Sequence, residues 1–483
     1  MVRKKRYSLL LLLVVVEVGC MVACNKKWDD HNAITDPAIG NNLFQAINKN
    51  ASLTTFSDLL VKSGYAKIIA SSKTYTVWAP SNQALASLDP AIVNDSVKLR
   101  AFVGNHIANL SYTTAFANQR VPMLNGKYIL FAGTMFDSAN ITGANFYTSN
   151  GVYHVIDKYI PRIDNCWEFV NNSTSYPLFK AALMSLNYNF FDSTKATHTT
   201  NPLTGDPIWD STNAISVRNA FLNKVQNIAD ESNVYTLIVL TDNSFSTEFN
   251  KLSPWFVTIT NNVDTTKSLA SYYLIKDLAV KGSYTAAQLP DTLLSTSGVK
   301  IPIDKSKILA SYKTSNGYVH VMSRVNFNLV DKFPPIIIQG ENPTSFATTD
   351  KSFYTYYRTR NNPNTGITFN DILMQNYGYS NYFIRYNITA VPAMRYNASW
   401  VAVNDVQTKP LWTQRLAVGN LSDTTFKSDT IAYKNYDEVY LGQFQLDSYR
   451  SKINLFIIGP TGSSTSGGNN SITLDYLKLT PAF

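Results

Sequence analysis

Two stretches decide the fold: TYTVWAPSNQAL at Thr74–Leu85 and TSNGVYHVID at Thr148–Asp157. The first is typical of a short apolar strand that a Pro-Ser-Asn turn closes, followed by a helix that Ser81 or Asn82 caps. The second places an Asn-Gly pair before a strand of alternating apolar residues, which indicates a tight turn in which Gly supplies a positive φ. Together they predict a domain that mixes strands with helices.

Both stretches recur further along the chain at similar spacing. YTLIVLTDNSFSTEF at Tyr235–Phe249 repeats the strand and helix pattern, and TSNGYVHVMS at Thr314–Ser323 repeats the turn and strand. Self-similarity at a fixed offset is the signature of repeated structural units. The sequence therefore predicts two equivalent domains.

The repeated segments resemble the fasciclin (FAS1) domain. The first copy also contains LRAFVGNHI at Leu99–Ile107, similar to the family helix that ends near a histidine. The second copy lacks the proline and that histidine, and it carries a polar insertion around Thr194–Asp210. The resemblance implies fasciclin domains at 41–165 and, in divergent form, at 172–330. The residues that match the motif are Pro80, Asn82, His106, Asn150, Gly151 and His154, and then Asn316, Gly317 and His320.

The histidines of these motifs allow two interpretations. His106, His154 and His320 lie among apolar residues, and a metal or catalytic trio is conceivable. A structural role, in which each ring bonds an acceptor and fixes the packing of the closing strand, is favoured because no carboxylate recurs at matching positions.

Beyond the Phe-Pro-Pro break at Phe333–Pro335, helical periodicity almost vanishes and short strands separated by turns are expected, which favours an all-β sandwich at 334–483. The fold class predicted for the chain is multidomain: two α+β fasciclin domains followed by an all-β jelly-roll-like sandwich. Short motifs in the last part resemble galactose-binding-like carbohydrate-binding modules. That resemblance implies a structural calcium ion shared by Glu341 and Asp475, the one cofactor expected, with ordinary surface polarity as the alternative. The predicted strands are Pro335–Gln339, Tyr382–Thr389, Lys409–Val418, Glu438–Leu446, Ile453–Ile458 and Ser471–Leu479.

Sugar binding needs flat aromatic faces flanked by amides and carboxylates. The candidate rings in the sandwich are Tyr377, Tyr379, Trp400 and Trp412. Many such rings fill the core of a β domain, and that alternative stays open for each. Tyr377 and Tyr379 flank a glycine in a polar turn, where exposure is expected.

The N-terminus is typical of a secretory signal: Met1–Arg6 is basic and Ser8–Val16 is apolar. MVAC at Met21–Cys24 resembles a lipobox, which implies a signal peptide over 1–24, a lipid on Cys24, a tether over 25–40 and an outer-membrane position. The acidic residues after it resemble Bacteroidetes-type signals for cell-surface export. An ordinary cleaved signal with free secretion is the alternative. Cys166 is expected to be a buried, inert thiol.

Composition and motifs exclude several function classes. The formal charge of +9 includes the four basic residues of Arg3–Arg6, and the other bases are scattered, so nucleic acid is not an expected partner. Zincin, nucleophile-elbow, phosphate-loop, Rossmann and Cys-x-x-Cys patterns are absent, so no enzyme activity is expected. The sequence favours a surface lipoprotein that helps capture glycan, beside an outer-membrane transporter. The alternative is adhesion to a surface or matrix protein through the fasciclin domains.

Overall fold

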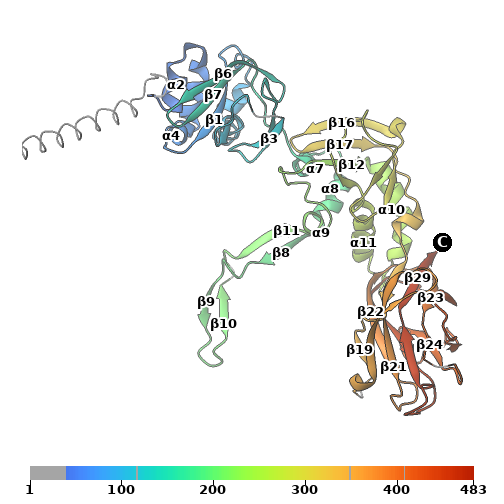
Figure 1. Ribbon diagram of the computed structural model, residues 1–483. Helices are drawn as coiled ribbons and strands as arrows, with labels where there is room; N and C mark the ends of the chain where they lie inside the picture. Colours follow the sequence, from blue (N-terminus) through green and yellow to red (C-terminus); the bar gives the residue numbers. More distant parts are fainter. Residues whose placement is uncertain (1–39, 116–117, 211, 348–349, 407) are drawn as a thin grey trace, which may run out of the picture. The chain divides into compact units, whose positions relative to one another are not determined.

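The computed structural model describes residues 40–483 except 116–117, 211, 348–349 and 407 (Figure 1). They form two compact units. The first runs up to Asn165 and includes Asp230–Asn233, and the second comprises Cys166–Ala229 with Val234–Phe483. The predicted signal peptide, lipidated Cys24 and residues 25–39 of the tether lie outside the described residues. Within the described part, no helix combines the length and apolar character needed to cross a bilayer.

The first unit is built on a mixed sheet with the strand order β2-β1-β7-β6-β5-β4-β3. β1 (Tyr75–Pro80) runs parallel to β7 (Gly151–Ile156) and is buried along its whole length. Alternation sends Val77 towards the helices, while Trp78 packs on the opposite side against Phe131 and Phe136. The other elements are α2 (Leu43–Lys49), η1 (Ala51–Leu53), α3 (Thr54–Lys62), α4 (Tyr65–Ile69), α5 (Pro90–Val93), α6 (Ser96–Gly104), β2 (Ile107–Asn109), β3 (Gln119–Pro122), β4 (Tyr128–Phe131), β5 (Met135–Phe136) and β6 (Ala139–Thr148).

The helix predicted directly after Pro80 is wrong, because residues 82–87 form turns. Asn82 instead ties that turn to α3: its side chain accepts a hydrogen bond from Thr55 N–H at 2.9 Å and donates to the Ala51 carbonyl at 2.9 Å. The side-chain oxygen therefore satisfies an N–H at the start of a different helix, one that precedes β1 in the chain.

The second unit begins with a similar mixed sheet, ordered β13-β12-β17-β16. β12 (Tyr235–Leu240) is parallel to β17 (Gly317–Met322), and Tyr235 pairs with Gly317 as Tyr75 pairs with Gly151 in the first unit. The other elements of this half are α7 (Cys166–Asn172), α8 (Pro177–Met184), α9 (Ala220–Lys224), α10 (Asp242–Leu252), η2 (Ser253–Phe256), α11 (Val263–Ile275), β13 (Ala279–Lys281), β14 (Thr292–Leu294), β15 (Lys300–Pro302), η3 (Lys305–Lys307), β16 (Ile308–Thr314) and α12 (Leu329–Lys332).

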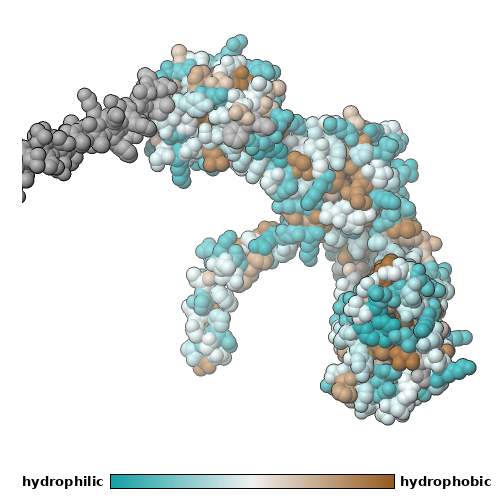
Figure 2. All heavy atoms as spheres, in the orientation of Figure 1, coloured by the Kyte–Doolittle hydropathy of each residue, from teal (hydrophilic) through white to brown (hydrophobic). Residues whose placement is uncertain are grey.

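The polar insertion is a long ribbon, which we call the arm (Asn187–Asn219). β8 (Asn187–Phe191) pairs with β11 (Ile215–Asn219), and β9 (Thr197–Thr200) pairs with β10 (Pro207–Asp210). Among the described residues, neither pair has a third strand, and Figure 2 shows hydrophobic side chains along the arm. Exposed apolar side chains on the arm include Phe191, Trp209, Ile215 and Val217.

The rest of the second unit is an antiparallel sandwich with strand orders β18-β29-β23-β26, β19-β22-β27-β24-β25 and β20-β21-β28. Each strand predicted from the sequence contains or overlaps an observed one, and the last is broken at Asp475 into β28 and β29. The strands are β18 (Ile336–Gln339), β19 (Ser345–Phe346), β20 (Thr355–Asn361), β21 (Thr368–Gln375), β22 (Phe383–Val391), β23 (Arg395–Val401), β24 (Thr413–Val418), β25 (Asp429–Thr430), β26 (Val439–Gln445), β27 (Arg450–Ile458), β28 (Ser471–Leu474) and β29 (Tyr476–Ala482), and η4 (Ser352–Tyr354) is a helical turn before β20.

A buried ion pair holds the connection between the mixed sheet and the sandwich. Lys332, the last residue of α12, places Nζ 2.6 Å from Oδ2 of Asp277, and both side chains are fully buried. Asp277 also accepts hydrogen bonds from Ser295 Oγ at 2.9 Å and from Ser297 Oγ. Burial alone would raise the pKa of Asp277, but the ammonium groups of Lys332 and Lys276 lower it overall. The two charges therefore compensate each other where neither could be buried alone.

Candidate functional site

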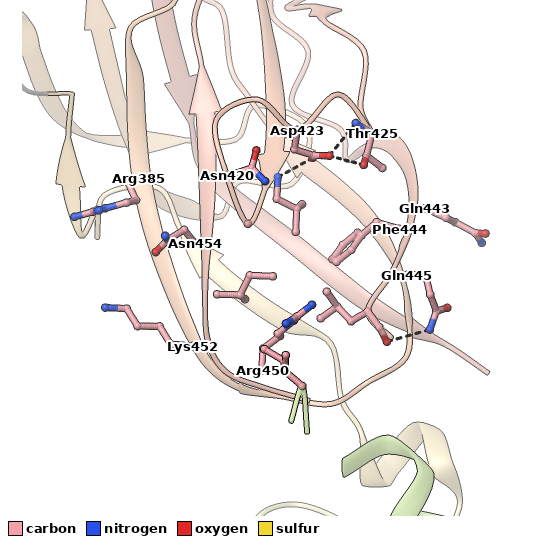
Figure 3. Close-up of a pocket in the computed structure, with 15 residues that line it drawn as sticks. Arg385, Asn420, Asp423, Thr425, Gln443, Phe444, Gln445, Arg450, Lys452 and Asn454 are labelled. Atoms are coloured by element: carbon pink, nitrogen blue, oxygen red, sulfur yellow. Dashed lines mark hydrogen bonds between the residues drawn. The ribbon is translucent and has the colours of Figure 1, made fainter. Parts of the chain in front are cut away.

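A polar groove runs along the sandwich, on the outer face of the sheet that contains β22, β27 and β24 (Figure 3). Its volume is about 930 Å³, at the upper end of the range of ligand pockets. Strand alternation explains the lining: inward-facing Ile384 and Tyr386 are buried, so Arg385 between them faces outward. The same period places Lys452 and Asn454 of β27 on this outer face.

The loop after β24 closes one side of the groove, and hydrogen bonds of Asp423 hold this loop in place. Its carboxylate accepts hydrogen bonds from Val418 N–H at 2.9 Å and from Thr425 Oγ1 at 2.6 Å. Arg415 Nη1 donates to the Asp423 carbonyl at 2.6 Å. Burial would raise the pKa of Asp423, but the hydrogen bonds from Thr425 and Val418 lower it overall. This wall is therefore preorganised, with its acidic group directed into its own loop.

Amide side chains supply most of the uncharged polar groups of the groove: Asn420, Gln443, Gln445 and Asn454. In Figure 3, Arg385, Asn454 and Lys452 lie along one side of the groove, with Asp423, Phe444 and Gln443 on the other. The Phe444 ring is only 7% exposed. Recognition in this groove would therefore rest on hydrogen bonds and charge, with little ring stacking.

Three of the rings predicted to bind sugar are in the core. Tyr377 is 0% exposed, Trp400 1% and Trp412 2%, so the prediction of a ligand-binding role is wrong for these three. Trp400 lies on the inner side of β23, where alternation also buries Tyr396 and Ala398. Burial raises the pKa of the Tyr377 hydroxyl, which has no hydrogen-bond partner. Positive φ angles at Asn376 and Gly378 turn the chain on both sides of Tyr377.

Tyr379 is 45% exposed and lies in a second surface feature, which we call the aromatic edge (Tyr357 and Tyr379, with Lys351 beside both). Lys351 Nζ lies 4.4 Å from the centroid of the Tyr379 ring. Lys351 and Tyr357 also line a hollow of about 370 Å³ beside β19. This edge offers the exposed rings that the groove lacks.

Glu341 and Asp475 lie close enough for the charge of one to act on the other. Asp475 is 8% exposed, and its pKa is raised to about 7 by burial and by the charges of Asp371 and Glu341. Oε2 of Glu341 is buried without a hydrogen-bond partner in the described part of the chain. Asp371 is already paired with Arg358. Glu341 and Asp475 thus fit the predicted pair of calcium ligands, because a cation would offset both carboxylates.

No group of three or more His, Cys, Asp or Glu side chains in the described residues is arranged to hold a metal ion. A calcium ion at Glu341 and Asp475 would therefore need backbone carbonyls or water as its remaining ligands, and calcium accepts both.

The predicted motif residues of the first unit organise the backbone. Oδ1 of Asn150 accepts from Leu43 N–H at 2.8 Å, while Nδ2 donates to the Ile69 carbonyl at 2.8 Å. Gly151 has a φ of 150°, and a Cβ there would lie 2.0 Å from the Tyr75 carbonyl oxygen. Only glycine fits this approach of β7 to β1. Pro80 is the last residue of β1 and is buried.

The second unit repeats this arrangement. Oδ1 of Asn316 accepts from Cys166 N–H at 2.9 Å, and Nδ2 donates to the Ile228 carbonyl at 2.9 Å. A Cβ on Gly317 would lie 1.8 Å from the Tyr235 carbonyl oxygen. Cys166 takes the place that Leu43 has in the first unit, and its buried Sγ lies 3.4 Å from Thr314 Oγ1.

The three motif histidines also bond to backbone groups. Ile160 N–H donates to Nε2 of His106 at 3.0 Å, so the proton is on Nδ1, which donates to the Phe102 carbonyl at 3.0 Å. Nε2 of His154 and of His320 lie 2.9 Å from the carbonyls of Tyr112 and Tyr284 respectively. Burial lowers the pKa of His106 to about 4 and lowers those of the other two. Each ring is neutral and links two segments of the backbone through hydrogen bonds.

The residues that line the groove are not among those predicted from the sequence, because that prediction rests on aromatic rings. A signal existed: Arg385 and Asn387 lie two residues apart in the predicted strand Tyr382–Thr389, and Lys452, two residues before Asn454, directly precedes the predicted strand Ile453–Ile458. Polar residues at this period mark the solvent face of a strand.

Comparison with known proteins identifies one part of the chain by family. Residues 51–161 match the Fasciclin domain. Comparison with curated proteins gives no significant match.

Among solved structures, the chain is similar to a FAS1 domain pair of the insect cell adhesion molecule fasciclin I, at 16% identity over 59% of this chain and 100% of that chain, with a TM-score of 0.24. It is also similar to a family 35 carbohydrate binding module from Clostridium thermocellum, at 17% identity over 31% of this chain and 100% of that chain, with a TM-score of 0.22. A third similar structure is the carbohydrate-binding module CBM36 in complex with calcium and xylotriose, at 13% identity over 30% of this chain and 98% of that chain, with a TM-score of 0.20. The chain thus contains a fasciclin domain at residues 51–161 and is similar in structure to a FAS1 pair and to carbohydrate-binding β-sandwiches.

Proposed function

We propose that this protein binds glycan at the cell surface through the groove of its sandwich and catalyses no reaction. The groove carries this proposal, because it combines a fixed loop, amide side chains and outward-facing cations in one hollow of about 930 Å³. Sugars offer many hydroxyl groups, and such a lining can pair with them. The match to the Fasciclin domain at 51–161 fits a binding protein.

We further propose that the chain comprises two fasciclin domains, at 41–165 and 172–330, followed by the sandwich. The shared strand order and the paired Asn-Gly contacts of β7 and β17 support this division. A lipid on Cys24 would hold the protein at the outer membrane, beside a transporter that takes up the captured glycan. Replacing Cys24 with serine would then move the protein from the membrane fraction to the soluble fraction, whereas Cys166→Ser would not.

A calcium ion at Glu341 and Asp475 would stabilise the sandwich by supplying positive charge beside buried carboxylates. The unpartnered Oε2 of Glu341 and the raised pKa of Asp475 support this site.

Glycan binding is tested with the full chain carrying Cys24→Ser, by electrophoresis through gels that contain polysaccharide. We expect retardation in at least one polysaccharide gel. Asn454→Trp, which places a large ring on one side of the groove, should abolish the retardation. Tyr379→Ala at the aromatic edge is the matched control. Loss of retardation only in the Tyr379 variant would move the site to that edge.

A second function is adhesion to a protein partner through the fasciclin domains. The exposed apolar side chains of the arm, among them Trp209 at 43% and Val217 at 68%, favour this alternative, because contiguous exposed apolar surface often marks a protein contact. The absence of retardation in any polysaccharide gel by the folded protein would support it over glycan binding.

A further inference from the structure

The groove carries more positive charge than its neighbours neutralise. Arg385 of β22, and Arg450 and Lys452 of β27, line it, and Asp423 is the one carboxylate among its described lining residues. Both Asp423 oxygens already accept hydrogen bonds, from Val418 and Thr425. The Asp423 carboxylate is therefore engaged in hydrogen bonds within its own loop. The three cations dominate the charge of the open groove.

None of these three cations forms an ion pair with a carboxylate in the described part of the chain. The ion pairs of the sandwich involve other residues, such as Arg358 with Asp371 and Lys478 with Glu438. Nε of Arg385 is buried and has no hydrogen-bond partner among the residues that the structure describes. A buried donor without a partner costs free energy, so the groove gains most from a ligand that brings acceptors to Arg385.

The aromatic content of the groove and the positions of its cations also favour a ligand that carries hydrogen-bond acceptors. A neutral sugar is usually held on an exposed aromatic ring, and Phe444, which is 7% exposed, is the one aromatic residue among the described residues that line the groove. In Figure 3, Arg385 and Lys452 lie on the side of Asn454, and Arg450 lies between the two sides at the lower end of the drawn residues. Cations spaced along a strand pair suit a chain with repeated negative charges. Arginine also binds carboxylate and sulfate in two-pronged fashion.

We infer that the groove selects acidic polysaccharide, with uronate carboxylates or sulfate esters engaging Arg385, Arg450 and Lys452. This inference rests on the proposed glycan-binding function and names its ligand class. The two anionic groups share one chemistry, and the test separates them by using both kinds of polymer.

The test measures the affinity of the full chain with Cys24→Ser for polygalacturonate, for a sulfated galactan and for neutral mannan and xylan. We expect at least one acidic polymer to bind about tenfold or more tightly than the neutral ones, and the affinity to fall as NaCl is raised from about 50 to about 500 mM. Arg385→Gln should weaken binding about tenfold or more, and Arg385→Lys by less, because the charge remains but the planar fork is lost.

Lys351→Gln at the aromatic edge is the matched control and should leave the affinity for the acidic polymer unchanged. Thermal melting of each variant checks that the sandwich is folded. Equal or tighter binding to neutral polysaccharide, insensitive to salt and to Arg385→Gln, would overturn the inference and leave glycan binding standing. Failure to bind any polysaccharide would overturn both. Equal binding to double-stranded DNA of the same charge density would show general polyanion attraction and would also overturn the inference.

Discussion

The carboxylates around Asp475 make the stability of the sandwich depend on pH. The pKa of Asp475 is raised from 3.8 to about 7 by burial and by the charges of Asp371 and Glu341. The folded sandwich therefore holds a proton that the unfolded chain releases, and stability is lost as pH rises from about 4 to about 7. A shift of this size corresponds to at most about 4 kcal/mol. Because a little solvent reaches the side chain, we expect about 2–3 kcal/mol.

Asp475→Asn replaces the carboxylate with a neutral group of the same shape. In EDTA at pH 8 the variant should be about 2–3 kcal/mol more stable than the unmodified chain, and at pH 4 the two should be nearly equal. Urea unfolding, followed by tryptophan fluorescence at both pH values, measures the difference. The exposed Asp447→Asn is the matched control and should change stability at neither pH. Equal stability of Asp475→Asn and the unmodified chain at pH 8 would show that the charge of Asp475 does not destabilise the sandwich.

Calcium should also change the stability of the sandwich at high pH. An ion bound at Glu341 and Asp475 should raise the unfolding midpoint of the unmodified chain at pH 8, because it binds only the folded state. Asp475→Asn should remove this effect. A midpoint that is unchanged by millimolar calcium would exclude the proposed site while leaving the effect of pH intact.

Four further substitutions have predicted outcomes. Asp277→Asn leaves the ammonium of Lys332 buried without a counter-charge and should lower the free energy of unfolding by about 3–5 kcal/mol. Lys332→Met should lower it by less, because two serines and Lys276 still face Asp277. Denaturant unfolding compares the two variants, and equal losses of stability would count against this explanation. Gly151→Ala should destabilise the first unit by about 2–4 kcal/mol in a thermal melt, since a Cβ would lie 2.0 Å from a carbonyl oxygen at a φ of 150°, and a change below about 1 kcal/mol would contradict that contact. Tyr377→Phe removes a buried hydroxyl without a partner and should raise stability by about 1 kcal/mol while leaving glycan binding unchanged; weaker binding by this variant would return Tyr377 to the ligand site.

Local patterns predicted the central strands well. The apolar run of β1 and the Asn-Gly turn before β7 each carry their structural reason within a few residues, as do most strands of the sandwich. The paired Asn150 and Asn316 contacts could not be predicted, since the partners of Asn150 include Ile69 and Ser71, about eighty positions earlier in the chain.

Exposure of aromatic rings was predicted poorly. Tyr377 lies in a polar turn that looks solvated, yet the positive φ angles of Asn376 and Gly378 flank a ring that packs inward. The burial of Trp400 could have been predicted, because Tyr396, Ala398 and Trp400 alternate along β23 as the residues of a buried face do. The pairing of Lys332 with Asp277 joins positions 55 residues apart and leaves no local signal.

The most direct test of glycan binding in the sandwich groove is calorimetric titration of polygalacturonate into the full chain with Cys24→Ser, with and without Asn454→Trp. We expect saturable binding by the protein without Asn454→Trp and none by the protein with it, with both melting at the same temperature. Saturable binding of equal affinity by both proteins would contradict this expectation, because the ligand would then lie outside the groove.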